Sequence, residues 1–478
     1  MIANTNNFLL ARFKKVLAIV RLRPFDMATP EGRSNERYRR VVMSALASAV
    51  AKGISILTLL VSVPLTVNYL GLERYGLWMT LSSMVALLGF ADLGMGNGLL
   101  NAISDAHGRE STEEAGEYVS SAFFTLAGLA VILVVLFALI YPLLPWQRIF
   151  NITSAQASAE IGPSVIVFTV CSLLSIPLGI VQRVQIGYQE GFVNSLWQGA
   201  GNILSLLCLL LVVYLRLGLP WLVLALVGSP VITLFFNSVV LFGMRRPWLR
   251  PRWSRITGSA AKRIFHTGIL FFVLQIAVAL AFSSDNIIIT QILGLEMVAK
   301  YAVPARMFSV IPMISAMIVS PLWPAYGESI TRGETNWVRK TLVRSLVGVL
   351  TFSSTLSLVL IYYGDEIVKR WVGPEVMPSS VLLLGLGLWT VLLCTGNAIS
   401  MFLNGINAMK FQAFISILLA ITAILFKIIL TQSVGIPGIV WGTAIAYIVC
   451  IFIPYLVYVP KKLAFAMKSK AADEKHAY

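Results

Sequence analysis

The sequence predicts an all-α polytopic membrane protein with about 12 transmembrane helices in two six-helix bundles around a central cavity. Hydrophobic residues make up 58% of its 478 residues, charged residues make up 12%, and the mean hydropathy is +0.83. These values lie outside the range of soluble globular proteins. Apolar runs of roughly 20 residues, the length that a membrane-spanning helix needs, recur along the chain. A basic stretch at 245–263 divides them six and six.

The element boundaries follow from where the apolar runs begin and end. The predicted spans are 41–67, 77–100, 118–144, 164–182, 191–215, 221–244, 264–292, 301–322, 341–364, 379–403, 411–430 and 436–459. The predicted domains are a basic N-terminal segment (1–40), an N-terminal bundle (41–244), a basic linker (245–263), a C-terminal bundle (264–459) and a tail (460–478).

Lysine and arginine are distributed unevenly between alternate loops, with 27 on one side of the predicted spans and 6 on the other. Cytoplasmic loops of membrane proteins carry the excess of these residues. We therefore expect both termini and the linker to be cytoplasmic. Most of the net charge of +16 then encodes orientation. Nucleic-acid binding is not expected, because no basic domain stands outside the membrane.

The first forty residues carry nine lysines and arginines before the first predicted span. Apolar residues at helical spacing among them are typical of a helix lying on an anionic leaflet. A basic tail that only sets the orientation is an equally good interpretation. A cleaved signal peptide is not expected, because Lys14 and Lys15 interrupt the apolar core that it needs.

Neither a metal site nor enzymatic chemistry is predicted. The four cysteines and three histidines are far apart in the sequence and lack metal-ligand spacing. No cofactor is expected. The longest predicted outer loop, 145–163, has only Arg148 and Glu160 as charged groups, whereas a membrane enzyme normally needs a large outer loop that carries its catalytic residues. The sequence therefore favours a transporter.

The two halves of the chain contain a repeated motif. Leu-Gly-Leu-Glu occurs at 70–73, after the first predicted span, and again at 293–296, after the seventh. An aromatic residue, Trp78 or Tyr301, follows seven residues after each glycine. A duplicated six-helix unit accounts for this pattern. Two copies with the same orientation are related by an axis normal to the membrane, and paired bundles of this kind open a central cavity alternately to each side.

Lys52 is a charged residue deep inside an apolar run. It lies eleven residues into the first predicted span, roughly 16 Å along the helix at ~1.5 Å per residue. A lysine at that depth costs several kcal/mol unless it is paired or hydrated. It predicts a water-filled cavity or a facing anionic group. A structural ion pair inside one bundle and a snorkelling lysine are the alternatives.

Two aspartates also interrupt apolar runs. Asp92 precedes three alternate glycines and has three open roles: binding a coupling ion, pairing with Lys52, or capping a broken helix end. Asp285 and Arg306 lie at similar depth in the seventh and eighth runs, which makes an ion pair between them plausible, either as a structural pair or as a gate or substrate contact. Lys427, three residues from the end of its run, is expected to snorkel to the outer interface.

Four segments resemble the polysaccharide flippases, the Wzx-type translocases of the multidrug/oligosaccharidyl-lipid/polysaccharide (MOP) exporter superfamily. These segments are YLGLERYGLW and FADLGMGNGL in the first two spans, GYQEGFVNSLW between the fourth and fifth, and SSDNIIITQILG at the seventh. The resemblance covers nearly all of residues 41–460. Twelve spans in two bundles of six is the architecture of that family.

The resemblance implies movement of an undecaprenyl-pyrophosphate-linked oligosaccharide from the cytoplasmic to the outer leaflet of the bacterial cytoplasmic membrane. Polysaccharide polymerase and chain-length machinery are the expected partners. A cavity between the bundles would lower the cost of moving polar groups through hydrocarbon. Its candidate residues are Lys52 or Arg306 for the pyrophosphate, Trp78, Gln275, Asn286 and Tyr301 for sugar, and Asp92 or Asp285 for ion or proton coupling.

Other functions share much of this pattern. A multidrug or metabolite antiporter of the same superfamily would have the same fold, but cationic substrates would favour uncompensated acids over the basic set seen here. A flippase of the lipid-II type differs only in its substrate. These alternatives stay open in the sequence.

Overall fold

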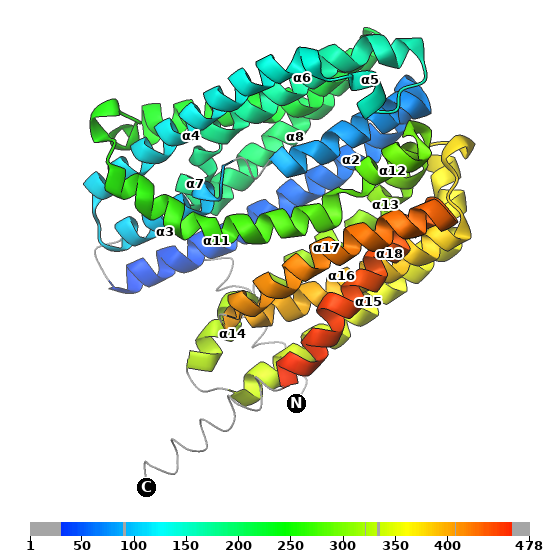
Figure 1. Cartoon of the computed structure of the whole chain (residues 1–478). Coiled ribbons are helices and arrows are strands. Elements are labelled where there is room, and N and C mark those ends of the chain that lie inside the picture. The colour runs from blue at the N-terminus through cyan, green and yellow to red at the C-terminus, as the bar shows by residue number, and fades with distance from the viewer. Residues whose placement is uncertain (1–29, 89–91, 321, 332–334, 407, 461–478) are drawn as a thin grey trace.

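The computed structural model describes residues 30–460 except for 89–91, 321, 332–334 and 407. All the regular structure in these residues is helical (Figure 1). The helices of the first half are α2 (Pro30–Leu88), α3 (Met95–Gly108), α4 (Thr112–Ile140), α5 (Trp146–Ile149), α6 (Ala155–Leu178), α7 (Ile180–Gly187), α8 (Gly191–Tyr214), α9 (Leu219–Val223) and α10 (Ser229–Val239). Those of the second half are α11 (Gly258–Ser283), α12 (Asp285–Leu293), α13 (Leu295–Val319), α14 (Leu322–Thr331), α15 (Thr335–Trp371), α16 (Ser380–Gly405), α17 (Met409–Val434) and α18 (Pro437–Tyr447).

Eleven helical segments of the described residues are long and apolar enough to cross a membrane, which confirms the all-α polytopic prediction. The second predicted span, 77–100, is not a continuous helix: α2 ends at Leu88 and α3 begins at Met95. The seventh is also broken, at Ser284 between α11 and α12. Irregular backbone at membrane depth is tolerated only where it is buried in protein or lines a cavity. The two breaks therefore indicate where polar chemistry lies.

The repeated Leu-Gly-Leu-Glu motif forms the same backbone structure in both halves. Gly71, inside α2, has φ 75° and ψ 173°, and Gly294, between α12 and α13, has φ 91° and ψ 169°. A side chain is strained at such positive φ values, so glycine is required at both bends. The matching conformation supports a duplicated unit in which Gly71 and Gly294 are equivalent positions.

Residues 30–245 are called the N-lobe here and residues 258–460 the C-lobe. Figure 1 shows helices α15–α18 of the C-lobe, yellow to red, lying beside the blue, cyan and green helices of the N-lobe, with the green α11 along the boundary. The end of the molecule that contains Gly71 and Gly294 is called the kink end, and the opposite end, which contains residues 246–257, the linker end.

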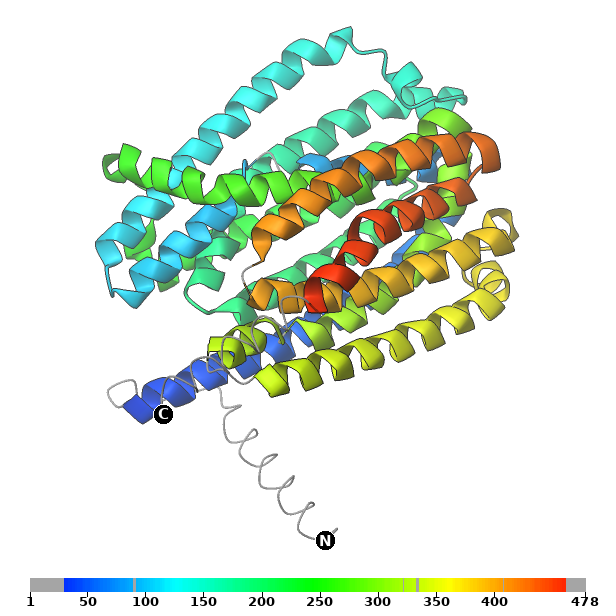
Figure 2. The same ribbon diagram turned by 60° about the horizontal axis from the view of Figure 1, so that its bottom comes forward.

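Helix α11 joins the two lobes. At the linker end it packs so closely on α3 that a Cβ atom on Gly94 would lie 2.2 Å from the carbonyl oxygen of Gly268. Arg263 of α11 also pairs with Asp105 of α3 at 2.9 Å. Its other half lies alongside α17 in both views (Figure 2). Helix α11 thus connects the two lobes at the linker end.

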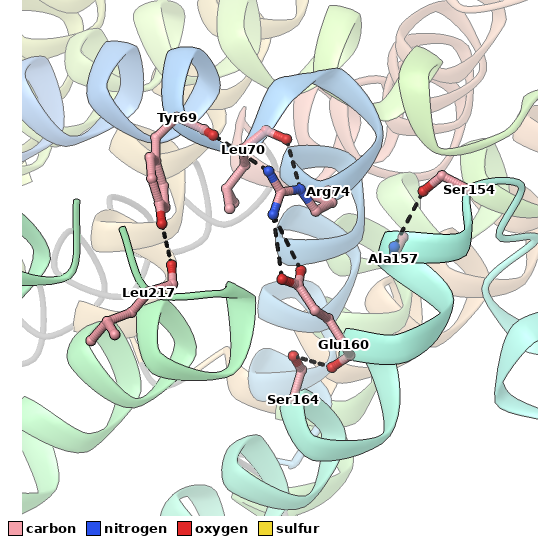
Figure 3. Close-up of polar contacts among 8 residues, drawn as sticks. All are labelled: Tyr69, Leu70, Arg74, Ser154, Ala157, Glu160, Ser164 and Leu217. Atoms are coloured by element: carbon pink, nitrogen blue, oxygen red, sulfur yellow. Dashed lines mark hydrogen bonds and ion pairs between the residues drawn. The ribbon is translucent and has the colours of Figure 1, made fainter. Parts of the chain in front are cut away.

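The bend at Gly71 is held by a polar cluster that Figure 3 shows. The Arg74 side chain donates to the carbonyl of Leu70 at 2.9 Å and pairs with Glu160 of α6 at 3.4 Å. The hydroxyl of Tyr69 donates to the carbonyl of Leu217. The part of α2 before Gly71 is called its first leg, and the part after Gly71 its second leg. These contacts fix the kink to the rest of the N-lobe, so that the second leg points toward the C-lobe.

Candidate functional site

Five cavities with shared lining residues form a series through the two lobes. Their volumes are about 150, 270, 430, 340 and 320 Å³. The 150 and 270 Å³ cavities share Gln182, and the 270 and 430 Å³ cavities share Ser55. The 430 and 340 Å³ cavities share Arg306, and the 340 and 320 Å³ cavities share Phe282. We name the 150 Å³ cavity the N-lobe cavity, the 430 Å³ one the central cavity, the 340 Å³ one the gate cavity and the 320 Å³ one the C-lobe cavity.

Arg306 lines both the central cavity and the gate cavity. Its side chain is exposed, and its guanidinium forms no ion pair or hydrogen bond with any described residue. Trp78 lines the central cavity beside it. A positive charge without a protein partner, standing between two lobes of a membrane protein, can bind an anionic group at low desolvation cost to itself.

The gate cavity contains Asp285, Asn286 and Tyr301. The Tyr301 hydroxyl donates to Asp285 Oδ2 at 2.5 Å. The ammonium nitrogen of Lys427, a side chain with no exposed surface, lies 2.5 Å from Asp285 Oδ1. Two predictions were therefore wrong. Asp285 pairs with Lys427 rather than with Arg306, and Lys427 does not snorkel to the membrane interface.

The break in the seventh span explains the position of Lys427. Carbonyl groups in the last turn of a helix lack intrahelical donors, and a cation is favourable beside them. The Lys427 ammonium donates to the Ala281 carbonyl in the last turn of α11 and lies 3.4 Å from the Ser284 hydroxyl. Three kinds of oxygen thus surround the ammonium and offset the cost of burying it.

Hydrogen bonds between the lobes close the kink end. Thr80 and Thr290 share one at 2.7 Å, and the Asn286 amide donates to the Ser83 hydroxyl at 2.8 Å. A Cβ atom on Gly76 would lie 1.9 Å from the Leu295 carbonyl oxygen, so glycine permits this close approach. Further hydrogen bonds from the C-lobe to the N-lobe, which the Asn286, Gln291 and Trp371 side chains donate to the carbonyls of Met79, Ile149 and Leu60, lie in the same half of the molecule.

Asp92 caps the start of α3. Its carboxylate accepts from the backbone N–H of Gly94 at 2.8 Å and of Gly96 at 3.2 Å. It also lines the N-lobe cavity with Arg183, which donates to the Asn97 side chain at 2.9 Å. Of the three roles considered for Asp92, the structure shows the capping contacts, and among the described residues it shows no ion pair with Lys52.

Lys52 and Gln275 lie apart from this group. Lys52 is half-buried on α2 and forms no ion pair with any described residue. Neither it nor Gln275, which is on α11, lines any of the five cavities. The structure thus gathers Trp78, Asp285, Asn286, Tyr301 and Arg306 around two adjoining cavities and leaves these two residues outside.

Lys427 is the residue of the site that sequence reasoning missed. The available signal was Asp285 itself, because an acid inside an apolar span needs a partner. Lys427 was the one other basic residue inside the C-terminal predicted runs besides Arg306 and Arg344. Choosing among them requires knowing which helix faces α12, and α17 takes that place only in the folded bundle.

The comparisons with known proteins agree on family. The model of the polysaccharide biosynthesis protein family matches residues 41–330, more than half of the chain. The chain belongs to that family. It is 22% identical over 405 residues to a proposed O-antigen transporter of Salmonella typhimurium, an alignment that covers 82% of this chain and 90% of the relative.

Solved structures with the same fold are transporters of the MOP superfamily. A multidrug resistance MATE family transporter in an inward-facing conformation aligns with a TM-score of 0.70 at 15% identity, covering 90% of this chain and 98% of its own. A MOP superfamily transporter from Pyrococcus furiosus aligns with a TM-score of 0.67 at 13% identity, covering 90% and 96%. The relatives by sequence and by fold are transporters rather than enzymes, in agreement with the prediction.

Proposed function

We propose that this protein translocates an undecaprenyl-pyrophosphate-linked oligosaccharide from the cytoplasmic to the outer leaflet by alternating access. The observation that carries the proposal is Arg306, an exposed cation without an ion pair among the described residues, at the junction of the central and gate cavities. A pyrophosphate needs such a charge in order to leave water. The family and the proposed role of the Salmonella relative support the same substrate class.

The contacts between the lobes indicate which side of the membrane the cavities of this structure open to. We assign the linker end to the cytoplasm, because the loops there hold most of the lysines and arginines. Hydrogen bonds between Thr80 and Thr290 and between Asn286 and Ser83 then close the outer side. Substrate enters from the cytoplasmic side, and the lobes exchange these contacts for others in the outward-facing state.

Coupling to an ion or proton is assigned to the pair formed by Asp285 and Lys427. Protonation of Asp285 removes the negative charge that faces the buried ammonium and leaves that ammonium unpaired, which is costly in a dry interior. The Lys427 side chain must then find another anion. A proton arriving at Asp285 thereby changes the relative free energy of the two states of the gate, which is what coupling requires.

Transport in proteoliposomes tests the proposal. The native protein is expected to move a fluorescent undecaprenyl-pyrophosphate oligosaccharide between leaflets, and Arg306→Ala is expected to slow this at least tenfold, since one charge-assisted contact to phosphate is worth about 1.5–3 kcal/mol. The matched control is Arg148→Ala, which removes an exposed arginine at the kink end. Normal flipping by Arg306→Ala would contradict the role of this residue.

The same assay separates the flippase from a drug or metabolite antiporter of the same fold. An antiporter for cationic substrates would be hindered by a free guanidinium in its cavity, because like charges repel. If the well-folded native protein moved cationic drugs and no lipid-linked oligosaccharide, the flippase proposal would fall.

A further inference from the structure

We propose that the C-lobe cavity binds the uncharged sugar moiety of the substrate. The inference rests on the proposed function and adds a second contact region to it. The cavity has a volume of about 320 Å³ and is lined by three amide side chains and three aromatic side chains that carry a polar atom. They come from α14, α16, α17, α18 and the helical residues that follow α18. They are Asn397, Asn404, Gln412, Trp323, Tyr447 and Tyr455.

The chemistry of this lining suits an oligosaccharide. No lysine, arginine, aspartate or glutamate is among the described residues that line the cavity. Sugar rings present hydroxyl groups around their edges and C–H groups on their faces. Side-chain amides both donate to and accept from hydroxyls, and aromatic rings combine an apolar face with a polar atom at the edge. A mostly apolar cavity with a few converging polar groups is the usual form of a small-molecule site.

Part of the hydrogen-bonding capacity in the cavity is unused by the protein. The Asn397 amide and the Trp323 indole N–H form no hydrogen bond with any described residue. Trp323 is 43% exposed. Their neighbours are held in place, because Gln412 donates to the Asn404 side chain at 2.9 Å and the Ser400 and Tyr455 hydroxyls lie 3.2 Å apart. Fixed neighbours reduce the entropy lost when a ligand binds.

One wall of the cavity depends on a glycine. A Cβ atom on Gly396 would lie 1.8 Å from the Tyr447 hydroxyl oxygen, so the absence of a side chain on α16 allows Tyr447 of α18 to take its place in the lining. The ring of Tyr447 also packs edge-on against Trp389, with centroids 5.2 Å apart. The aromatic wall is therefore built by the packing of the lobe.

The position of the cavity fits a substrate with a charged centre and an uncharged end. Phe282 lines both the C-lobe cavity and the gate cavity, and Arg306 lines the latter. A pyrophosphate held at Arg306 leaves the sugars attached to it next to Phe282, at the boundary of the C-lobe cavity. The N-lobe cavity has about 150 Å³ and contains both Asp92 and Arg183, which are costly to desolvate beside a neutral sugar.

The test compares two lipids on protein reconstituted in nanodiscs. One is undecaprenyl pyrophosphate without sugar, and the other is the undecaprenyl-pyrophosphate oligosaccharide purified from the organism that makes this protein. Native protein is expected to bind the second at least tenfold more tightly. The double variant Trp323→Ala/Asn397→Ala is expected to bind both lipids equally, with its affinity for the sugar-free lipid unchanged, while Arg306→Ala weakens both.

A matched control comes from the 270 Å³ cavity of the N-lobe, which also has a tryptophan and an amide in its lining. Trp197→Ala/Gln198→Ala is expected to keep the native preference for the sugar-bearing lipid. Loss of the preference in this control would place the sugar in the N-lobe and overturn the assignment. If the double variant does not fold, the single variant Asn397→Ser replaces it in the experiment. This smaller change is also expected to lose the preference for the sugar-bearing lipid.

The remaining outcomes are also decisive. Equal binding of the two lipids by native protein would overturn the sugar site but leave the pyrophosphate contact standing. An equal loss for both lipids in Trp323→Ala/Asn397→Ala would show that these residues act through the structure of the lobe, and the sugar site would fall. Native protein that binds neither lipid would instead overturn the proposed function, and the sugar site with it.

Discussion

The two kinks of this protein have nearly the same backbone and different chemistry. Gly71 and Gly294 bend the chain with φ and ψ values that agree within about 20°. When the two halves are aligned on these glycines, Ser62 corresponds to Asp285 and Ser83 to Arg306. The N-lobe thus has hydroxyl groups where the C-lobe has charges, although both pairs face the central or the gate cavity.

This difference indicates how a duplicated fold acquires a direction. Two equal lobes would hold a charged substrate symmetrically and could not couple its movement to a second charge on one side. Here the buried Lys427, the half-buried Asp285 that pairs with it, and Arg306, which has no ion pair among the described residues, all belong to the C-lobe. The N-lobe supplies neutral partners at the contact, namely Thr80, Ser83 and the backbone of Met79. The following predictions test this division.

The largest effect is expected from breaking the buried pair. Lys427→Met leaves Asp285, whose Oδ1 atom is buried, charged and without the ammonium. Removal of one partner of a buried ion pair costs about 3–5 kcal/mol. Ser62→Ala, the change at the N-lobe position equivalent to Asp285, should cost below about 1 kcal/mol, because within the described part of the chain the Ser62 hydroxyl makes only a long local hydrogen bond, to the Leu59 carbonyl at 3.5 Å. Unfolding of the purified protein in detergent measures both.

The double change Lys427→Met/Asp285→Leu sharpens this result. Removing both charges together avoids an unpaired group and can be nearly neutral for stability. We expect the double variant to recover most of the stability lost in Lys427→Met while losing any dependence of transport on pH. A double variant as unstable as the single one would show that the pair is not the source of the effect.

A second test concerns the contact between the lobes at the kink end. Gly76 corresponds to Ala299, which is buried, so only the N-lobe copy lacks a methyl group. Gly76→Ala places a Cβ atom 1.9 Å from the Leu295 carbonyl oxygen and should force the lobes apart there. In a cysteine-free background, cross-linking between Thr80→Cys and Thr290→Cys is expected to fall about tenfold, since ~1.4 kcal/mol of strain suffices for that factor. Gly128→Ala, which has nothing within 4 Å, is the control.

The third test moves the charge from one lobe to the other. Ser83 and Arg306 line the same gate cavity at equivalent points of the two repeats. Arg306→Ser should reduce flipping at least tenfold, and adding Ser83→Arg should restore it severalfold, because the guanidinium then enters the cavity from the opposite wall. Restoration would show that the cavity needs a positive charge there but not on a given lobe. No gain from Ser83→Arg would tie the pyrophosphate contact to α13.

The sequence was sufficient to predict the membrane class, the repeat and the approximate spans, because these depend on local hydropathy and on the glycines that the bends require. It also placed Asp92 and Asp285 inside the second and seventh spans, but it predicted both spans as continuous, whereas the helices break beside these residues. The partners of the charges could not be predicted in the same way. Lys427 is far from Asp285 in the sequence, and only the packing of α17 beside α11 and α12 brings them together.

The depth of a basic residue along its helix did not predict whether it lines a cavity, because that depends on the direction in which its side chain points. Lys52 and Arg306 were equal candidates, since both are basic residues inside apolar runs. Arg306 points into the interface between the lobes because α13 packs against the second leg of α2. Lys52 lies on the first leg, between Ser48 and Ser55, whose hydroxyls contact α8. A hydropathy pattern does not determine how each helix is rotated about its own axis.

The smallest effect is expected at Asp92, whose position resembles that of Asp285 because each begins a helix after a break in a span. Asp92 accepts from two backbone N–H groups and has no lysine partner like Lys427 among the described residues. Asp92→Asn keeps a capping oxygen, so its cost should be about 0.5–1 kcal/mol, and the pH dependence of flipping should match that of native protein. Asp285→Asn should remove that dependence. If instead Asp92→Asn removed it, the coupling group would lie in the N-lobe, and the division of roles between the lobes would be reversed.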